Sequence, residues 1–214
     1  MSISRLMMQA AANTGEPPPT VIGQEYGGGF YAGNITDGGV EYYLVVAPRA
    51  VNESVGLQWK TTSTLTAGTS SVIDGPANTA AMIAAGAAAH PAADFCNNLT
   101  LGGFSDWYMP SRNELEICYY NLKPTADANN TSSGANPNAV PPRFGNYTSG
   151  VPAQTSVAAF QSGGAEAFDT GSYQTSLQND ALRAWRQSFL NGFQGGDSSK
   201  ISAIRVRAVR RVPV

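Results

Sequence analysis

Few side chains in this sequence are of the types that carry out acid–base or nucleophilic chemistry. The chain has one histidine, His90, and two cysteines, Cys96 and Cys118. His90 follows an alanine-rich stretch and precedes Pro91, a position that favours a helix-end or packing role over a Ser–His–Asp relay. No H-E-x-x-H, Cys-x-x-Cys or phosphate-binding glycine motif is present. We therefore expect a protein that is not an enzyme, with no catalytic residue and no cofactor.

The most plausible binding residues lie in one long irregular segment. Residues 125–150 are rich in Asn, Pro, Ser, Thr and Gly, and ordered irregular segments of this length are usually functional loops. Arg143, Phe144, Asn146 and Tyr147 combine a cation, an amide and aromatic rings, a composition that suits recognition surfaces. The sequence thus predicts a binding loop here, with an ordered packing loop as the alternative.

A metal site is not expected in this segment. Calcium-dependent sugar binding needs several oxygen ligands, carboxylates among them. Asn136-Pro137-Asn138 supplies only neutral amides, and the later strand reads Trp185-Arg186-Gln187. We interpret the Asn-Pro-Asn sequence as a structural turn, and Trp107 and Trp185 as core anchors rather than sugar platforms.

The segment 101–115 predicts the corner that would position these loops. A glycine-rich turn leads into Asp106-Trp107, and Pro110 stands just before Ser111. Ser111 and Glu114 have the S-x-x-E spacing of a capping box, in which each side chain bonds the other residue's backbone N–H. We predict a strand-to-helix corner held by a buried tryptophan.

Other elements follow from hydrophobic spacing and from glycine and proline. Strands are expected at 41–47, 57–60, 184–190 and 201–212, helices at 78–89 (capped by Asn78), 92–99 and 111–122, a tight turn at Asn191-Gly192, and a loop or interrupted strand pair at 26–39. The inward face of the third helix should carry Leu115, Cys118, Tyr119 and Leu122. This order is typical of an α+β fold in which two helices pack on a looped antiparallel sheet.

The N-terminal residues read as a separate unit. Ile3, Leu6 and Met7 share one face of a short helix over 2–12, and the Pro17-Pro18-Pro19 run follows as a stiff extended spacer. We interpret residues 1–20 as an anchoring peptide with a proline-rich spacer, a frayed terminus being the alternative, and residues 21–214 as one domain.

Charge and composition exclude some classes of partner. Only 13% of residues are charged and the net charge is −2, so no basic surface for nucleic acid is expected. The basic run from Arg205 to Arg211 is interpreted as a strand with arginines on one solvated or paired face. No apolar stretch approaches the roughly 20 residues of a membrane span, and no secretory signal is evident. We expect synthesis in a bacterial cytoplasm, with two free buried thiols.

Three motifs resemble one known family. They are Gly103-Phe104-Ser105-Asp106-Trp107-Tyr108-Met109-Pro110-Ser111 with Glu114-Leu115, Trp185-Arg186-Gln187-Ser188-Phe189, and Val206-Arg207-Ala208-Val209-Arg210. In order and spacing they resemble the family named for the C-terminal domain of the collagen-like adhesin Lcl, over roughly residues 75–211. The resemblance implies a C-type-lectin-like fold, which is shared with formylglycine-generating enzymes. The sequence departs from the family at Tyr108-Met109, usually Arg-Leu, and at Ala208, usually Cys, so a family disulfide through the last strand is lost.

A second resemblance concerns the first residues. Ser2 to Ala12 is similar to the start of several tailed-phage structural proteins. Together the two resemblances imply a virion protein, in the first place a tail-fibre or receptor-binding adhesin that contacts a bacterial surface glycan or protein. The alternative is a capsid decoration or head-fibre protein, and the outsider is a formylglycine-generating-type oxidoreductase. We expect other virion proteins as partners of the N-terminal peptide, and a homo-oligomer, a trimer being one form.

Overall fold

The computed structural model describes residues 15–214, and only the backbone of residues 51–55. The residues expected to anchor the chain, Ile3, Leu6 and Met7, lie outside this range. In chain order the elements are β1 (Glu25–Tyr26), β2 (Gly29–Asp37), β3 (Val40–Val46), α2 (Arg49–Asn52), β4 (Glu53–Gln58), α3 (Gly75–Ala84), η1 (Ala87–Ala89), α4 (Pro91–Asn97), α5 (Arg112–Leu122), β5 (Ala139–Val140), η2 (Ala158–Phe160), β6 (Ser172–Gln178), β7 (Arg183–Ser188), β8 (Gln194–Ser199), β9 (Ala203–Arg207) and β10 (Val209–Pro213).

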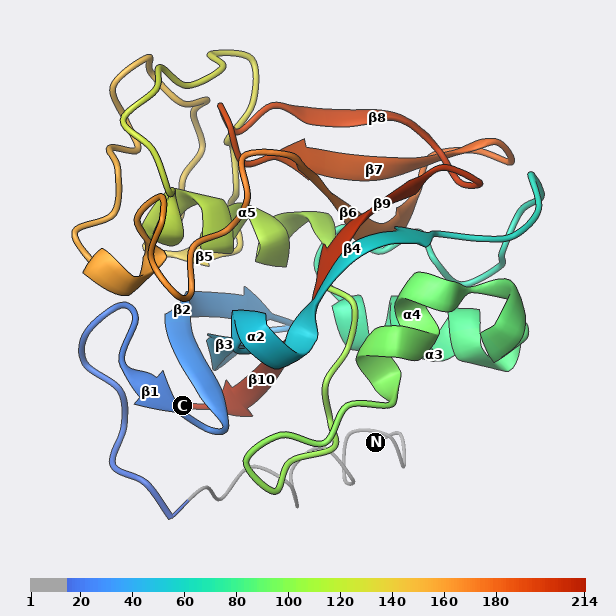
Figure 1. Cartoon of the computed structure of the whole chain (residues 1–214), viewed down its shortest axis with the longest axis horizontal. Helices are drawn as coiled ribbons and strands as arrows, with labels where there is room; N and C mark the ends of the chain where they lie inside the picture. The colour runs from blue at the N-terminus through green and yellow to red at the C-terminus, as the bar shows by residue number, and fades with distance from the viewer. Residues whose placement is uncertain (1–14) are drawn as a thin grey trace.

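The strands form two sheets, and the fold is mixed α/β with more sheet than helix. One sheet has the order β1-β2-β3-β10, with β5 paired to β2, and the other has the order β4-β9-β6-β7-β8. All pairings are antiparallel except that of β6 with β9. Helix α5 contacts β2 of the first sheet and β6 and β7 of the second, so it lies between them (Figure 1). The sequence predicted one looped antiparallel sheet, whereas the chain divides its strands between two.

The predicted strand 201–212 is two strands that belong to different sheets. β9 pairs with β4, and after Ala208 the chain passes to the other sheet, where β10 pairs with β3 from Val209 opposite Val46. The arginines of this segment do not share one solvated face, because Arg207, Arg210 and Arg211 are all buried. Each pairs with a carboxylate instead, as a buried guanidinium must.

The alanine-rich helix begins earlier than its sequence indicated. Asp74 rather than Asn78 is the N-cap of α3, and its side chain accepts a hydrogen bond from the Ala77 N–H. Asn78 is buried inside the helix, where its amide donates to the Ser71 carbonyl at 2.7 Å and to Ser176 Oγ at 3.1 Å. The α-helix ends at Ala84 and is followed by the short η1. Asn78 therefore ties α3 to β6 and does not start the helix.

The corner before α5 has the local structure that its sequence predicted. Ser111 Oγ accepts from the Glu114 N–H, and the Glu114 carboxylate accepts from the Ser111 N–H at 2.7 Å. Pro110 and Trp107 are buried. Asp106 binds Arg210 through both carboxylate oxygens, at 2.7 and 2.9 Å. The corner is thereby tied to β10.

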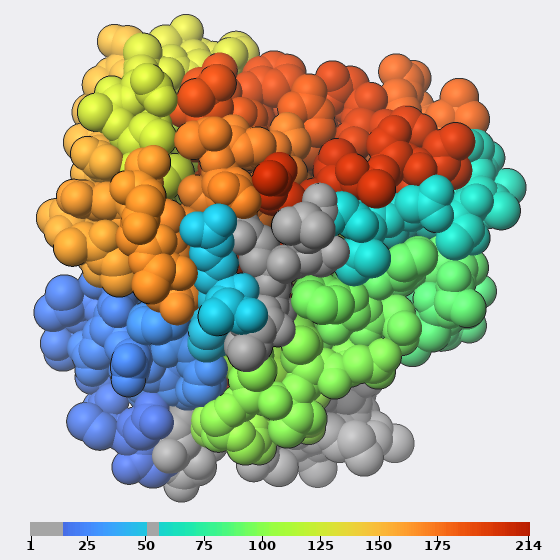
Figure 2. All heavy atoms as spheres, viewed as in Figure 1, coloured from blue at the N-terminus to red at the C-terminus, as the bar shows by residue number. Residues whose placement is uncertain are grey.

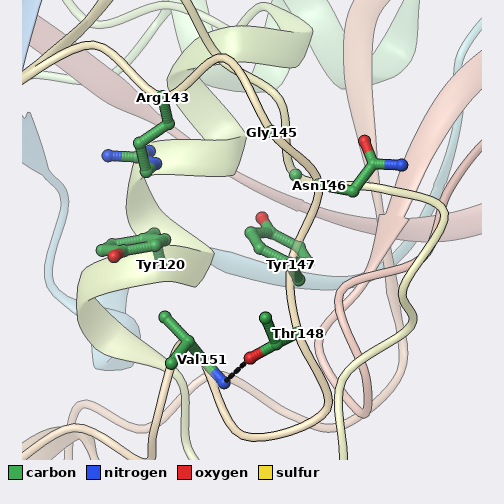
Figure 3. Close-up of a pocket in the computed structure, with 8 residues that line it drawn as sticks. Tyr120, Arg143, Gly145, Asn146, Tyr147, Thr148 and Val151 are labelled. Carbon is green, nitrogen blue, oxygen red and sulfur yellow. Dashed lines mark hydrogen bonds between the residues drawn. The ribbon is translucent and has the colours of Figure 1, made fainter.

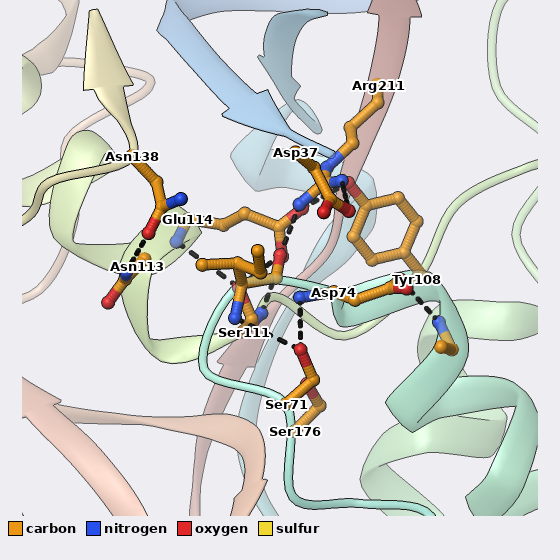
Figure 4. Close-up of polar contacts among 12 residues, drawn as sticks. Asp37, Ser71, Asp74, Tyr108, Ser111, Asn113, Glu114, Asn138, Ser176 and Arg211 are labelled. Carbon is orange, nitrogen blue, oxygen red and sulfur yellow. Dashed lines mark hydrogen bonds and ion pairs between the residues drawn. The ribbon is translucent and has the colours of Figure 1, made fainter. Parts of the chain in front are cut away.

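Glu114 also organises a buried polar cluster behind this corner (Figure 4). Its second oxygen accepts from Tyr108 Oη and from Arg211 Nε, both at 2.6 Å, and Arg211 also pairs with Asp37. Tyr108 stands where the family has arginine, and its hydroxyl is one of the groups that satisfy Glu114. Burial and the Glu114 charge raise the pKa of Tyr108 well above its usual value, so its proton stays on the hydroxyl as the donor.

The four residues predicted to face inward from α5, Leu115, Cys118, Tyr119 and Leu122, are all buried, as predicted. They belong to a core cluster with apolar residues of β2, β3 and β6, while a second cluster gathers α3, α4 and Trp59. Asn191-Gly192 lies in a turn, as predicted, with Gly192 at φ +76°, but β7 ends already at Ser188, and β8, the strand that follows the turn, was not predicted. Residues 26–39, expected as a loop or an interrupted strand pair, contain β2 and its turn into β3.

Candidate binding site

The chain between α5 and β6, residues 123–171, forms a platform of loops at one corner of the molecule (Figure 2). Only β5 and η2 are regular within it. We call these residues the loop platform. They include the segment 125–150 that the sequence singled out. What holds so long an irregular segment in one shape is a set of buried polar side chains.

Glu116 on α5 is the centre of one such set. Its side chain is fully buried, and three donors converge on its carboxylate: Asn136 Nδ2 at 2.7 Å, Tyr147 Oη at 2.8 Å and the Arg143 guanidinium. Burial raises the pKa of Glu116, while these three partners favour its charged form. All three donors come from the loop platform. One helical carboxylate therefore fixes three points of the loop.

Two further side chains close the base of the platform. Lys123 donates its ammonium group to the Asp127 and Pro152 carbonyls, and it is 1% exposed. Asn129 donates to the Thr148 and Pro152 carbonyls and accepts from Tyr119 Oη at 2.7 Å. Unpaired backbone carbonyls in a buried loop would each cost free energy, and these contacts satisfy them.

Arg143 and Tyr120 form one wall of a surface pocket (Figure 3). The guanidinium carbon of Arg143 lies 3.9 Å from the centre of the Tyr120 ring, the geometry of a cation–π contact. The pocket has a volume of about 270 Å³ and is also lined by Asn146, Tyr147 and Val151. Its shape depends on Gly134, whose φ is +114° and where a Cβ atom would lie 2.3 Å from the Tyr147 ring.

Three of the four residues predicted to bind line this pocket. Arg143 and Tyr147 are held by Glu116 and form the inner wall of the pocket, whereas Asn146 is exposed. Phe144 is not among the lining residues, and its side chain is 80% exposed at the loop surface. Tyr147 and Arg143 thus pack the loop, whereas Asn146 and Phe144 are exposed at its surface.

A second hollow of about 220 Å³ adjoins the first, with Gly134 and Asn146 common to both. It is lined by Arg112, Ser132, Ser133, Ala135, Trp185 and Gln194 as well. Trp185 is only partly buried, so it is not the core anchor that its motif suggested. The guanidinium carbon of Arg112 lies 5.1 Å from the centre of the Trp185 ring.

Sequence reasoning did not single out Glu116, Tyr120 or Arg112. Glu116 lies between two buried apolar residues of α5. A carboxylate between apolar residues of a helix is the one sequence signal that could have indicated a buried polar contact here. Its partners are 20 to 31 residues away in the chain, so no local spacing reveals them. In the sequence, Arg112 is marked only by its position directly after the Ser111 cap.

The Asn136-Pro137-Asn138 turn has the structural role expected of it. Asn136 donates to the Asn113 carbonyl at 2.9 Å as well as to Glu116, and Asn138 Oδ1 accepts from Asn113 Nδ2 at 2.9 Å. These bonds attach the turn to the start of α5. Among the side chains that the structure describes, no group of three or more His, Cys, Asp or Glu could hold a metal ion.

The side chains of His90, Cys96 and Cys118 are buried and line neither hollow. His90 is engaged at both ring nitrogens, by Thr66 Oγ1 and by the Gly86 carbonyl, each at 2.9 Å, and burial lowers its pKa. Cys96 and Cys118 are free and buried, as expected, and burial raises the pKa of both thiols far above their usual value. A thiol held in its protonated form is a poor nucleophile.

Two lysines are buried near His90, and neither has a carboxylate partner among the described side chains. Lys60 Nζ donates to the Leu65 carbonyl and to Thr66 Oγ1, and Lys200 Nζ donates to Gln178 Oε1 at 2.9 Å and to the Thr64 carbonyl at 3.1 Å. Lys200 also lies over the Trp59 ring. Burial and the charge of Lys60 lower the pKa of Lys200 to about 8.

The described helices include none long and apolar enough to cross a bilayer.

Comparison with known proteins identifies the family of the chain. The family described as the Lcl C-terminal domain matches residues 50–210, so the chain belongs to this family. No curated protein matches. Among solved structures, a fimbrial protein from Bacteroides ovatus is similar over 78% of this chain and 35% of that one, with 13% identity and a TM-score of 0.45. The chain thus spans about a third of that protein's length.

Proposed function

We propose that this protein is a non-enzymatic adhesin, whose loop platform recognises a glycan or protein on a bacterial surface. The observation that carries the proposal is the way Glu116 holds Asn136, Arg143 and Tyr147, and with them an irregular surface segment, in one conformation. A loop that is already ordered pays less conformational entropy when it binds. Membership of a family named for an adhesin domain supports the same role.

We also propose a C-type-lectin-like fold and a place in a tailed-phage virion. The features that support the fold are the helices, the long loop segment and the sheet in which β3 lies between β2 and β10. In the virion, the protein would be a tail-fibre or receptor-binding protein attached through its N-terminal residues. The place in the virion rests on the resemblance of Ser2 to Ala12 alone.

The absence of catalysis is part of the proposal. His90, Cys96 and Cys118 are buried and line neither hollow, which supports this part of the proposal. What the hollows present instead is amides, hydroxyls, guanidinium groups and aromatic rings. Such groups are suited to holding a polar ligand by hydrogen bonds.

Adherence of the purified full chain to bacterial cells tests the adhesin role. Fluorescently labelled protein should bind cells of the susceptible host, and an antibody raised against residues 125–150 should block the binding. The replacement of Tyr147 by Ala, which removes the ring beneath Gly134 and one Glu116 contact, should reduce adherence, whereas Glu25→Gln on the exposed β1 should not. Protein that binds no cells at all contradicts the role.

The same antibody tests the place in the virion. Electron microscopy of labelled phage particles should show antibody at the tail tip. Label over the shell would favour the capsid decoration alternative, in which the loop platform contacts neighbouring shell subunits. Particles without label would contradict both virion roles while leaving the adhesin role to the adherence assay.

A further inference from the structure

Arg112 differs from every other arginine that the structure describes. The remaining arginines of residues 15–214 each lie within ion-pair distance of an aspartate or glutamate. Arg112 has no such partner within these residues, and its one polar contact is a 3.4 Å bond from Nε to Asn113 Oδ1. Its two terminal nitrogens therefore have donors to spare.

This arginine is held in place rather than free to move in solvent. Its guanidinium group lies over the Trp185 ring, with a cation–π distance of 5.1 Å. The backbone of Gly196 lies close to the same ring, since a Cβ atom there would be 3.0 Å from Trp185 Cε2. Trp185 is thus enclosed between Arg112 and β8, and its role is to orient the guanidinium group beside the 220 Å³ hollow.

Other groups lining this hollow are also donors without partners. Gln194 Nε2 is buried and makes no hydrogen bond within the described residues, although its Oε1 accepts from the Gly134 N–H at 3.4 Å. That bond fixes the orientation of the amide, because turning it would point the NH₂ group at another N–H. The exposed side chain of Asn146, at the rim, has no partner within these residues either.

The local charge also favours an anion. Arg112 and Arg143 carry two positive charges near the hollows, and Glu116, the acid of α5 that faces them, neutralises only Arg143 by direct contact. An unpaired buried donor costs free energy until a ligand satisfies it. A carboxylate matches the planar fork of a guanidinium with two parallel hydrogen bonds. The volume is below the about 300–1,000 Å³ of pockets for drug-sized ligands, so it suits a single small ring.

We propose that the hollow formed by Arg112, Gln194 and Asn146 binds the carboxylate of a sugar acid, with the ring hydroxyls on the two amides. This inference rests on the proposed function and specifies its ligand: one acidic monosaccharide unit within a surface glycan. Recognition is by a single oriented guanidinium group and not by a broad basic surface, in agreement with the net charge of −2.

Nuclear magnetic resonance on the full chain gives a direct test. Three tryptophan indole N–H signals are expected, and those of Trp59 and Trp107 are internal controls because each donates to a backbone carbonyl. The probes are D-galacturonate, D-glucuronate and N-acetylneuraminate, with D-galactose and D-galactose 6-sulfate for comparison. At least one of the three acids should shift the Trp185 signal saturably, and galactose should not.

Variants decide whether Arg112 is responsible. Arg112→Gln should weaken binding of the acid at least tenfold, and Asn146→Ala, at an exposed position, should weaken it without any risk to folding. Arg183→Gln, which removes a solvent-exposed arginine paired with Asp180, should leave binding unchanged. No shift of the Trp185 signal with any of the three acids, or equal binding by the Arg112 variant, would overturn the proposal, and so would equal binding of the 6-sulfate.

The cell assay separates this inference from the proposed function. If wild type and Arg112→Gln adhere equally well to cells, the sugar-acid site is wrong and the adhesin role stands. If neither adheres, the adhesin role fails, and with it the biological setting of the site. Adherence by wild type that galacturonate competes away, and that the Arg112 variant lacks, supports both.

Discussion

Replacement of Glu116 by Gln or Leu is the sharpest test of how the loop platform is held. Glutamine keeps one acceptor oxygen, which can still accept from Asn136 and Arg143, while its NH₂ group can donate to Tyr147 Oη. Two bonds then change from charge-assisted, about 1.5–3 kcal/mol each, to neutral, about 0.5–1.5. We expect Glu116→Gln to lower the free energy of unfolding by about 2 kcal/mol.

Leucine at this position leaves no acceptor. The Arg143 charge then has neither an ion-pair partner nor a hydrogen-bond acceptor at this largely buried position, and breaking a buried pair in this way costs about 3–5 kcal/mol. Urea denaturation followed by circular dichroism measures both losses. Hydrogen exchange localises them, because the Asn136 and Tyr147 amides bond across the loop, to the Arg143 and Ser133 carbonyls. Both amides should exchange faster in the leucine variant.

Glu25→Gln, on the exposed surface of β1, is the matched control and should change stability by less than about 0.5 kcal/mol. The reasoning is refuted if the leucine variant is within 1 kcal/mol of wild type and both amides keep their protection. Faster exchange at those amides with an unchanged urea midpoint would mean that the loop platform opens without the rest of the fold, and that the loss is local.

Other substitutions test the remaining parts of the architecture. Ser111→Ala removes the α5 cap and should lower the free energy of unfolding by about 1–2 kcal/mol in urea titrations. Gly134→Ala should cost about 1–3 kcal/mol because of its positive φ and the Tyr147 ring, whereas Gly145→Ala, which faces open space, should cost much less. The pKa of Lys200 is about 8 when folded and about 10.4 when unfolded, so the unfolded chain holds more protons between these values. Wild type should therefore gain stability relative to Lys200→Met as pH rises from 8 to 10, and a difference independent of pH would contradict the burial of that charge.

The parts of the fold that could be predicted from sequence depend on local signals. The Ser111–Glu114 box, the inward face of α5 and the Asn191-Gly192 turn are each encoded within a few residues. The strand at 41–47 likewise follows from its own apolar run, and appears as β3. Local backbone preferences and hydrophobic spacing decide these elements without reference to the rest of the chain.

The predictions were wrong or incomplete where contacts between residues distant in the sequence determine the structure. The sequence left a solvated and a paired arginine face open between Arg205 and Arg211. The structure shows pairing at Arg207, Arg210 and Arg211, with carboxylates that the sequence did not identify: Glu166, Asp106 and Glu114. Asn78 has the sequence of a cap, yet its partner Ser176 is on β6. The candidate site shows the same division. Composition located the segment around Arg143 to Tyr147, whereas Glu116 and Arg112 act through contacts that no spacing reveals.

The passage of the chain from one sheet to the other at Ala208 has a consequence for folding during synthesis. β10 is the last described strand to leave the ribosome, and it pairs with β3, which left it more than 160 residues earlier. Until then one edge of β3 lacks its partner, and Asp106 and Glu114 lack the arginines that neutralise them. Pairings so distant in sequence form slowly. The sheet β1-β2-β3-β10 therefore stays incomplete until β10 has been synthesised, although it contains the first strands of the described residues.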